Sequence, residues 1–405
     1  MRILLTSWGS RGDVEPLAAL ALRVRELGGE VRACVPPDPE FGSVLARAGV
    51  TPIPLGPATR SIAAGLRAPD PDAAFRLAAE LVDARFATLP AAAAGCDAIV
   101  ATGLMPAGAR DVAEHLGIRY VLAAFHVFGL PSRHAPPSAR PGPPSPAGER
   151  DNRVLWQQDA ERVNGLYREA LNRNRRALGL PPVDNVRDHV LAGCVWLAAD
   201  PLLAPWKDLP DVEVVQTGAW ILPDDRPLPS ELEAFLDAGS PPIYVGFGSM
   251  AMRGASDLGS VALESARAHG RRLVLARGWA DLVSSGGPDQ GPEDRIVVGE
   301  VNQQALFRRV AAVVHHGGAG TTTTAALAGA PQVIVPQLVD QPHWARRIVE
   351  LGIGAAHDGP VPTTETLAAA LGTALAADTK DRAVAVAGRI RTDGSTVAAR
   401  LLLRT

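Results

Sequence analysis

The segment VVHHGGAGTTTT, residues 313–324, combines residue types that bind phosphate groups. An apolar run leads into His315 and His316, and a helix is predicted to start near Thr321. Glycines let the backbone approach an anion closely, and the N–H groups and dipole of a first helical turn favour negative charge. The Thr321 hydroxyl and the His315 ring could add donors, although a histidine at a strand end often serves only the fold. The segment therefore predicts a phosphate site.

This segment does not match the two common nucleotide motifs. It is neither GxGxxG after a first strand nor GxxxxGK[ST], so neither a dinucleotide site nor a P-loop is predicted. Four threonines at the start of a helix are unfavourable, because β-branched side chains lose rotamer freedom there. We therefore expect these hydroxyls to have another use.

A second polar pair follows the next predicted strand, in PQLVDQP. Asp340 and Gln341 supply a carboxylate and an amide, which together can bind the vicinal hydroxyls of a sugar. Asp340 could also serve as a helix N-cap, and the two roles are compatible. The pair fits a hexose with free hydroxyls better than a deoxyaminosugar.

The first strand of the chain also ends in a small-residue turn, TSWGSRGD. Asp13 stands at the position of an N-cap, before an apolar pattern at helical spacing that closes at residues 28–29. The pattern predicts a helix whose first turn carries a carboxylate.

Strands alternate with helices along the whole chain, which predicts an α/β fold with doubly wound parallel sheets. The predicted strands are residues 2–6, 30–36, 96–102, 120–125, 241–250, 271–278, 295–300, 311–318 and 331–337. PIYVGFGSM repeats the strand and glycine turn of RILLTSWGS, so we expect two Rossmann-like halves with a cleft between them. Ligands in such sheets bind outside the carboxyl ends of the strands.

The domain boundaries follow from composition. We predict a first domain at 1–203, a linker at 204–228, a second domain at 229–388, and a helix at 389–405 that could pack back on the first domain. The Pro-, Ser- and Gly-rich segment 131–148 is predicted to be a mobile loop or lid. It could form part of an acceptor site or be a plain surface insertion.

Composition excludes several classes of partner. A net charge of −3 over 405 residues gives no reason to expect a nucleic acid. Cys34, Cys96 and Cys194 are too dispersed for a disulfide framework or a zinc site. Neither a signal peptide nor a spanning segment is found, so we expect a cytoplasmic protein without stable membrane insertion, most simply a monomer.

HHGGAGTT, together with PQLVDQP and GSRGDVEPLAAL, resembles the nucleotide-sugar glycosyltransferases of the GT-B fold. AADPLLAPW, VQTGAWILPDDRPL, RGWADLV and TDGSTVAARLLL are similar to the bacterial natural-product branch, above all to enzymes that glycosylate vancomycin- and teicoplanin-type heptapeptides. The resemblance spans essentially the whole chain and departs most around 126–165. It implies two Rossmann-like domains facing a central cleft, a UDP- or TDP-sugar as donor, and a natural-product aglycone as acceptor.

The resemblance also implies roles for single residues. Asp13 is similar to the general base of that branch, and no histidine lies near the first helix to replace it. Val301 would contact the nucleotide base through its backbone beside Trp279, while Ser10 and Ser249 would approach the phosphates. The implied nucleotide-sugar contacts are Ser10, Arg11, Ser249, Trp279, Val301, His315, Gly318, Ala319, Gly320, Thr321, Asp340 and Gln341. His126 and Phe128 are the expected acceptor contacts.

One base without an enzyme nucleophile implies a single displacement with inversion. Backbone amides and a histidine would stabilise the leaving diphosphate, so no metal and no further cofactor are expected. The D-x-D of Asp70 and Asp72 is the alternative metal motif, but it lies far from the glycine turns in sequence.

Other functions remain open at this stage. The same chemistry could act on another aromatic or polyketide acceptor, or on a lipid or sterol, since GSRGDVEP resembles those enzymes too. A basic amphipathic helix for membrane docking is missing from the sequence. Two alternatives belong to other functional classes: a nucleotide-sugar epimerase, and a non-catalytic partner protein with a degenerate site.

Overall fold

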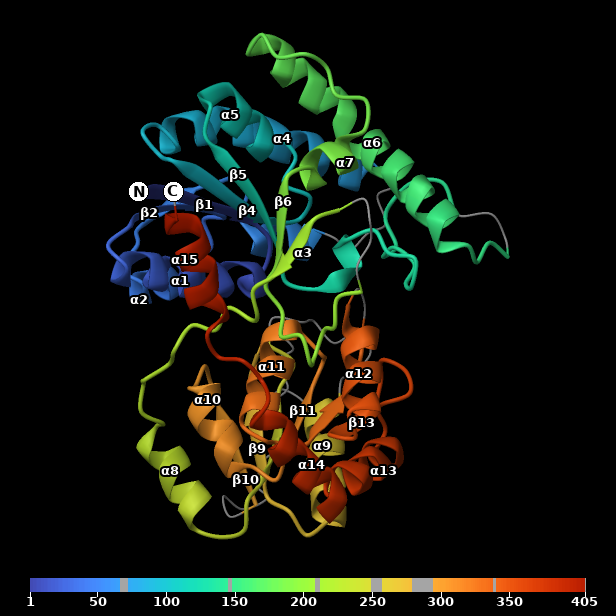
Figure 1. The fold of residues 1–405 in the computed structure, drawn as a ribbon. Helices are drawn as coiled ribbons and strands as arrows, with labels where there is room; N and C mark the ends of the chain where they lie inside the picture. The colour runs from blue at the N-terminus through green and yellow to red at the C-terminus, as the bar shows by residue number, and fades with distance from the viewer. Residues whose placement is uncertain are drawn as a thin grey trace. The chain divides into compact units, whose positions relative to one another are not determined.

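The computed structural model describes residues 1–65, 72–144, 148–207, 212–248, 257–278, 294–337 and 340–404. The chain forms two compact units, Met1–Leu222 with Arg391–Thr405, and Pro223–Ile390 (Figure 1). The first division falls within the segment predicted as a linker, residues 204–228. Among the described residues, no helix combines the length and apolar character needed to cross a membrane.

The first unit is built on a seven-stranded parallel sheet with the order β3-β2-β1-β4-β5-β6-β7. Its strands are β1 (Arg2–Trp8), β2 (Glu30–Val35), β3 (Pro52–Pro54), β4 (Ala98–Gly103), β5 (Arg119–Ala124), β6 (Cys194–Leu197) and β7 (Val214–Gln216). Its helices are α1 (Arg11–Glu26), α2 (Pro39–Arg47), α3 (Thr59–Gly65), α4 (Ala73–Ala92), α5 (Ala109–Leu116), η1 (Val127–Gly129), α6 (Asn152–Ala177), α7 (Val186–Leu191) and α15 (Gly394–Leu403).

Both faces of this sheet are buried, which is why its strands read as continuous apolar runs. Ile3 and Leu5 of β1 point to one face, where they pack in the core formed with α1 and α15. Leu4 points to the opposite face, toward α4 and α5. α15 lies beside α1 (Figure 1), and Arg119 donates a hydrogen bond to the Leu401 carbonyl at 3.0 Å.

The second unit carries a six-stranded parallel sheet with the order β10-β9-β8-β11-β12-β13. Its strands are β8 (Ile243–Val245), β9 (Leu273–Ala276), β10 (Arg295–Val298), β11 (Ala312–His315), β12 (Gln332–Ile334) and β13 (Gly354–Ala356). Its helices are α8 (Ser230–Asp237), α9 (Leu258–Ala268), α10 (Gln303–Leu306), η2 (Phe307–Arg309), α11 (Ala319–Leu327), α12 (Gln341–Glu350), α13 (Thr364–Ala374) and α14 (Ala377–Ala387). Val245 packs against α9 and α13 on one face, and Tyr244 packs toward α8, α10 and α11 on the other.

The segment 131–144 lies along α6 and is held to it by side-chain hydrogen bonds. Arg140 pairs with the fully buried carboxylate of Asp159 at 2.7 Å, and Trp156 donates to the Ala135 carbonyl at 2.9 Å. A buried ion pair of this kind is costly to break because it would leave a charge without a partner. The described part of the Pro-rich loop is thus tied to a long helix, and its role in acceptor binding stays a prediction.

Candidate active site

Asp13 lies in the first turn of α1, directly after the carboxyl end of β1. The N-cap of α1 is Ser10, whose hydroxyl accepts a hydrogen bond from Gly12 N at 3.2 Å. Asp13 is the third helical residue and completes a capping box, accepting from Ser10 N at 2.7 Å and from Ser10 Oγ at 3.3 Å. The sequence-based assignment of Asp13 as the N-cap was therefore wrong by three residues, but the carboxylate is still fixed at this turn.

Gly9 makes room for that carboxylate. A Cβ atom on Gly9 would lie 2.2 Å from Asp13 Oδ2, so the carboxylate would have to move to make room for it. Arg11, a predicted donor contact, is half-buried, and its guanidinium pairs with Glu15 at 2.8 Å along the helix. Ser10 is exposed, and its hydroxyl takes part in the capping box.

The predicted acceptor contacts lie at the same edge of the first sheet. His126 and Phe128 follow the carboxyl end of β5, and their ring centroids are 5.9 Å apart with planes inclined by 33°. Next to them, Phe125 meets Trp220 edge to face at 5.7 Å. Because β1, β4 and β5 are parallel neighbours, the turns that carry Asp13 and these aromatic rings lie at one edge of the sheet.

The glycine turn of the second unit joins β11 to α11. Gly318 is the N-cap and the helix begins at Ala319, two residues before the predicted start. The first N–H groups of an α-helix have no acceptor within the helix, so this turn presents donors to an anion. Two of the threonine hydroxyls donate to their own helix, Thr322 to the Gly318 carbonyl at 2.9 Å and Thr323 to the Ala319 carbonyl at 2.8 Å.

His315 is part of the core of this unit, with 0% of its surface exposed. Its Nε2 lies 2.9 Å from Gln332 Oε1, and its Nδ1 accepts a hydrogen bond from Gly317 N at 3.1 Å. Burial, and to a lesser extent His316, lower the pKa of His315 to about 3. The ring is therefore neutral with its proton on Nε2, and both nitrogens are engaged in joining β11, β12 and the turn.

His316 is the histidine that faces the glycine turns, and the sequence analysis gave it no role. A Cβ atom on Gly318 would lie 2.7 Å from His316 Nε2, and one on Gly248, after β8, would lie 3.6 Å from Cε1. Burial lowers the pKa of His316 to about 4, opposed by the Asp340 carboxylate, so the ring is neutral at pH 7. Strand alternation was the available signal, since successive side chains of β11 and its continuation point to opposite sides.

Asp340 and Gln341 lie at the start of α12, after β12. Asp340 occupies the N-cap position without capping through its side chain, and its Oδ2 accepts from the indole of buried Trp344 at 2.8 Å. Gln341 is 4% exposed, and its Oε1 accepts from Gln337 N at 2.7 Å. A Cβ atom on Gly317 would lie 3.4 Å from Gln341 Cβ, so this pair adjoins the glycine turn.

The remaining predicted donor contacts can be placed only in part. Val301 is half-buried after β10, beside Asn302, which caps α10 by accepting from Ala305 N at 2.9 Å. Ser249 and Trp279 lie outside the described residues. The described donor residues of the second unit thus follow the carboxyl ends of β10, β11 and β12.

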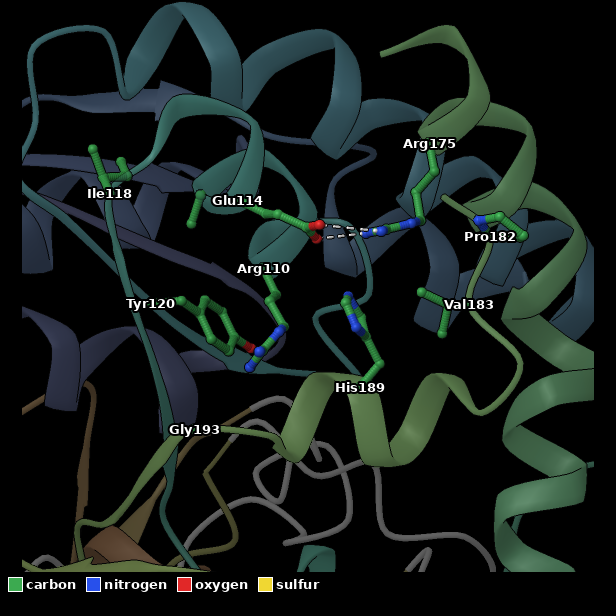
Figure 2. A pocket seen from close by; sticks show the side chains of 10 residues that line it. Arg110, Glu114, Ile118, Tyr120, Arg175, Pro182, Val183, His189 and Gly193 are labelled. Carbon is green, nitrogen blue, oxygen red and sulfur yellow. Dashed lines mark hydrogen bonds and ion pairs between the residues drawn. The ribbon is translucent and has the colours of Figure 1, made fainter. Parts of the chain in front are cut away.

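A group of possible metal ligands lies at the opposite edge of the first sheet. Asp111, Glu114 and His189 come together near the starts of β5 and β6. Glu114 and His189 line a pocket of about 570 Å³ (Figure 2). Arg175 is hydrogen-bonded to Asp111 and pairs with Glu114 at 2.9 Å, so a guanidinium is already the cation of this cluster. Burial alone would raise the pKa of Asp111, but His189 and Arg175 outweigh it and lower that pKa. The alternative motif of Asp70 and Asp72 has its first carboxylate outside the described residues.

Comparisons with known proteins agree over the whole chain. Residues 289–396 match the family described as erythromycin biosynthesis protein CIII-like, C-terminal domain. Glycosyltransferase GtfE of Amycolatopsis orientalis is 53% identical, covering 99% of this chain and 97% of its own length. From the same organism, vancomycin aglycone glucosyltransferase is 51% identical (100% and 97% covered), and dTDP-epi-vancosaminyltransferase is 48% identical (95% and 93% covered).

Solved structures share the fold at much lower identity. The glycotransferase of kitacinnamycin superposes with a TM-score of 0.75 at 22% identity, covering 99% of this chain and 98% of that one. The calicheamicin glycosyltransferase CalG4 superposes with a TM-score of 0.69 at 17% identity, covering 99% of this chain and 97% of that one. The predicted GT-B fold, with two parallel α/β units, is confirmed.

Proposed function

Because the chain belongs to the family of the vancomycin-type glycopeptide glycosyltransferases, we propose that it transfers a hexose or N-acetylhexosamine from a UDP- or TDP-sugar to a hydroxyl group of a glycopeptide aglycone. The chain is a glycosyltransferase by this membership. Two relatives whose names specify different sugars are about equally similar to it, so the choice of sugar rests on the site. Asp340 favours a hexose with free hydroxyl groups over a deoxyaminosugar: its Oδ2 accepts from Trp344 at 2.8 Å, and we propose that its Oδ1 accepts from a sugar hydroxyl.

The clamped carboxylate of Asp13 is the observation that carries the mechanism. Ser10 N–H and Ser10 Oγ hold Oδ2, which orients the side chain at the carboxyl edge of the first sheet. The acceptor oxygen attacks the anomeric carbon while Asp13 takes its proton, and the bond to the diphosphate breaks with its electron pair leaving on oxygen. A single displacement of this kind inverts the anomeric configuration.

The leaving diphosphate is accommodated at the start of α11. The N–H groups of Ala319, Gly320 and Thr321 belong to the first helical turn, where the dipole favours an anion. The neutral ring of His316 adds one N–H donor beside Gly318. These donors are already oriented before the reaction, and preorganised donors stabilise developing charge without a metal ion. We therefore propose a metal-independent reaction.

The test is transfer in the presence of EDTA, followed by mass spectrometry. The purified protein is incubated with a panel of UDP- and TDP-sugars and two glycopeptide aglycones, and the Asp13→Asn variant is assayed in parallel. The asparagine amide oxygen can still accept from Ser10 N, so this variant keeps the cap and removes the base. We expect a product heavier by one hexose or N-acetylhexosamine, with the rate reduced about 10²–10⁴-fold in Asp13→Asn.

Three results would contradict the proposal in different ways. Full transfer by Asp13→Asn would exclude Asp13 as the base. Activity that appears only when a divalent metal is restored would exclude the metal-independent mechanism. Diphosphate release without a glycopeptide product, in the presence of both aglycones, would exclude the proposed acceptor and favour a polyketide or lipid.

A further inference from the structure

Arg85 of α4 is a buried charge that the proposed mechanism does not use. Its side chain is 1% exposed. Nη2 donates to the Leu104 carbonyl at 3.0 Å, and Nη1 donates to the carbonyls of Met105 and Ala107 at 3.1 Å each. Within the described part of the chain, no carboxylate lies at ion-pair distance from this guanidinium. Burial lowers the pKa of Arg85 to about 10, so the group remains charged at neutral pH.

A buried charge without a counter-ion is costly, and an apolar side chain of similar length would fill the same space at lower cost. Unlike an apolar side chain, the guanidinium donates directional hydrogen bonds, because its planar fork reaches three carbonyls of one short loop. The backbone of residues 104–107 is thereby fixed on α4. Gly108, the next residue, adjoins the same helix, because a Cβ atom there would lie 3.2 Å from the Phe86 ring.

This loop is joined directly to the turn that carries Asp13. Leu104 N donates to the Trp8 carbonyl at 2.9 Å, where β1 ends. Gly103 has a φ of +86°, and a Cβ atom there would lie 2.5 Å from Trp8 O, so only glycine allows this approach. Trp8 is followed by Gly9, over which the Asp13 carboxylate lies. The loop held by Arg85 and the proposed base are therefore parts of one connected backbone arrangement.

Leu104 places an apolar side chain at this edge. It is 42% exposed, whereas Met105 packs inward against the core near α6 and α7. An exposed leucine in a loop that is bonded to the end of β1 offers the apolar surface that an aromatic acceptor needs beside its reacting hydroxyl.

We propose that Arg85 is a positioning residue that fixes the loop of residues 104–107, so that Leu104 contacts the aromatic acceptor beside Asp13 and sets acceptor affinity. This inference rests on the proposed function, because it assigns a contact to the same acceptor. It predicts that changes at Leu104 and Arg85 act on the acceptor and leave the donor unaffected.

The first experiment compares Leu104→Ala with Leu27→Ala. Leu27 is a leucine of similar exposure, 46%, on the same unit, but it follows α1 near the start of β2, at the opposite edge of the sheet. We expect Leu104→Ala to raise the acceptor KM, and the acceptor Kd measured without donor, by about five- to tenfold. The donor KM and the rate of donor hydrolysis by water should not change, and Leu27→Ala should match the unaltered protein.

The second experiment tests the link to Arg85 with Arg85→Lys and Arg85→Met, each alone and combined with Leu104→Ala. Lysine keeps the charge and some donors, so Arg85→Lys should raise the acceptor KM less than Arg85→Met. The effects at residues 85 and 104 should be clearly less than additive, because both act through one contact. Since Arg85→Met could impair folding, Arg85→Lys and Leu104→Ala alone are sufficient for the test.

The inference fails if Leu104→Ala and Leu27→Ala give the same acceptor Kd, or if Arg85→Lys changes only the donor KM. Either result is compatible with transfer by the unaltered protein, so the proposed function would stand. Failure of the unaltered protein to transfer any sugar would instead overturn the proposed function, while the acceptor Kd values would still decide this inference.

Discussion

At the scale of single residues, two adjacent histidines have different tasks because a strand alternates its side chains. His315 points into the core, and both of its nitrogens are bonded within the unit. His316 points to the glycine turns. The pair therefore offers a matched test, in which the same substitution at neighbouring positions has different effects on stability and catalysis.

We predict that His316→Ala lowers kcat/KM about 10- to 100-fold, the loss of one hydrogen bond to a charged group, and that it lowers Tm less than the same change at His315. His315→Ala should instead destabilise the protein by about 2–4 kcal/mol, because it removes a packed ring and leaves the buried Gln332 Oε1 without its donor. Steady-state kinetics with varied donor, together with thermal unfolding of both variants, would distinguish the two roles. The assignment would be reversed if His316→Ala lost stability and kept full activity.

At the scale of elements, the turn between β1 and α1 shows how a glycine can set the position of a carboxylate. The group that a Cβ on Gly9 would meet is the end of the Asp13 side chain, and such a group can move without unfolding the protein. Substitution at this position should therefore displace the proposed base and leave the helix intact.

We predict that Gly9→Ala lowers kcat about 10- to 100-fold, because a base displaced by about 1 Å loses its alignment with the acceptor hydroxyl. The donor KM should change less than kcat, since most of the predicted donor contacts lie on the other unit. Gly42→Ala in α2 is the control: apart from the neighbouring residues and the backbone of its own helix, no atom lies within 4 Å of the added Cβ. Equal kcat values for the two variants would show that the position of Asp13 does not matter.

The elements also show what could be predicted from the sequence. The nine predicted strands are all present, because each is an apolar run between turn residues. β3, β6, β7 and β13 were missed, although β8 and β12 are equally short. β3 begins and ends with proline, and β13 consists of glycine and alanine, so neither has a clear apolar pattern. Such short strands gain their stability from pairing with neighbours, which a local pattern does not reveal.

The sequence predicted which segments form the candidate site better than it predicted the roles of single side chains in it. The turns at residues 9–13, 315–321 and 340–341 all lie at the carboxyl edges of the two sheets. Which side chain caps α1 and which histidine faces the turn depend on backbone geometry, so the capping role of Ser10 and the orientation of His316 became evident only in the structure. Arg85 belongs to no motif, because its partners are backbone carbonyls 19 to 22 residues away.

At the scale of the whole molecule, the two units differ in how they respond to acid. His315, His316 and His343 all belong to the unit Pro223–Ile390. Burial lowers the pKa of His315 from 6.5 to about 3, and those of His316 and His343 to about 4. The first unit contains Asp111, whose pKa is lowered from 3.8, so its contribution to stability is lost only at more acidic pH.

The direction in which stability changes with pH depends on whether the folded or the unfolded state binds the proton. Below pH 6.5 the unfolded chain protonates these histidines while the folded unit does not, so stability is full above pH 6.5 and falls as the pH decreases. Each histidine contributes a slope of about 1.4 kcal/mol per pH unit until its folded pKa is reached. We therefore predict that the second unit unfolds before the first between pH 6 and pH 4.

Hydrogen exchange resolved by peptide would follow the loss of protection in each unit. His315→Gln keeps a polar group but does not titrate, so this control variant should show a weaker dependence of stability on pH. Simultaneous loss of protection in both units, or an unchanged slope in that variant, would contradict the assignment of the acid response to the second unit.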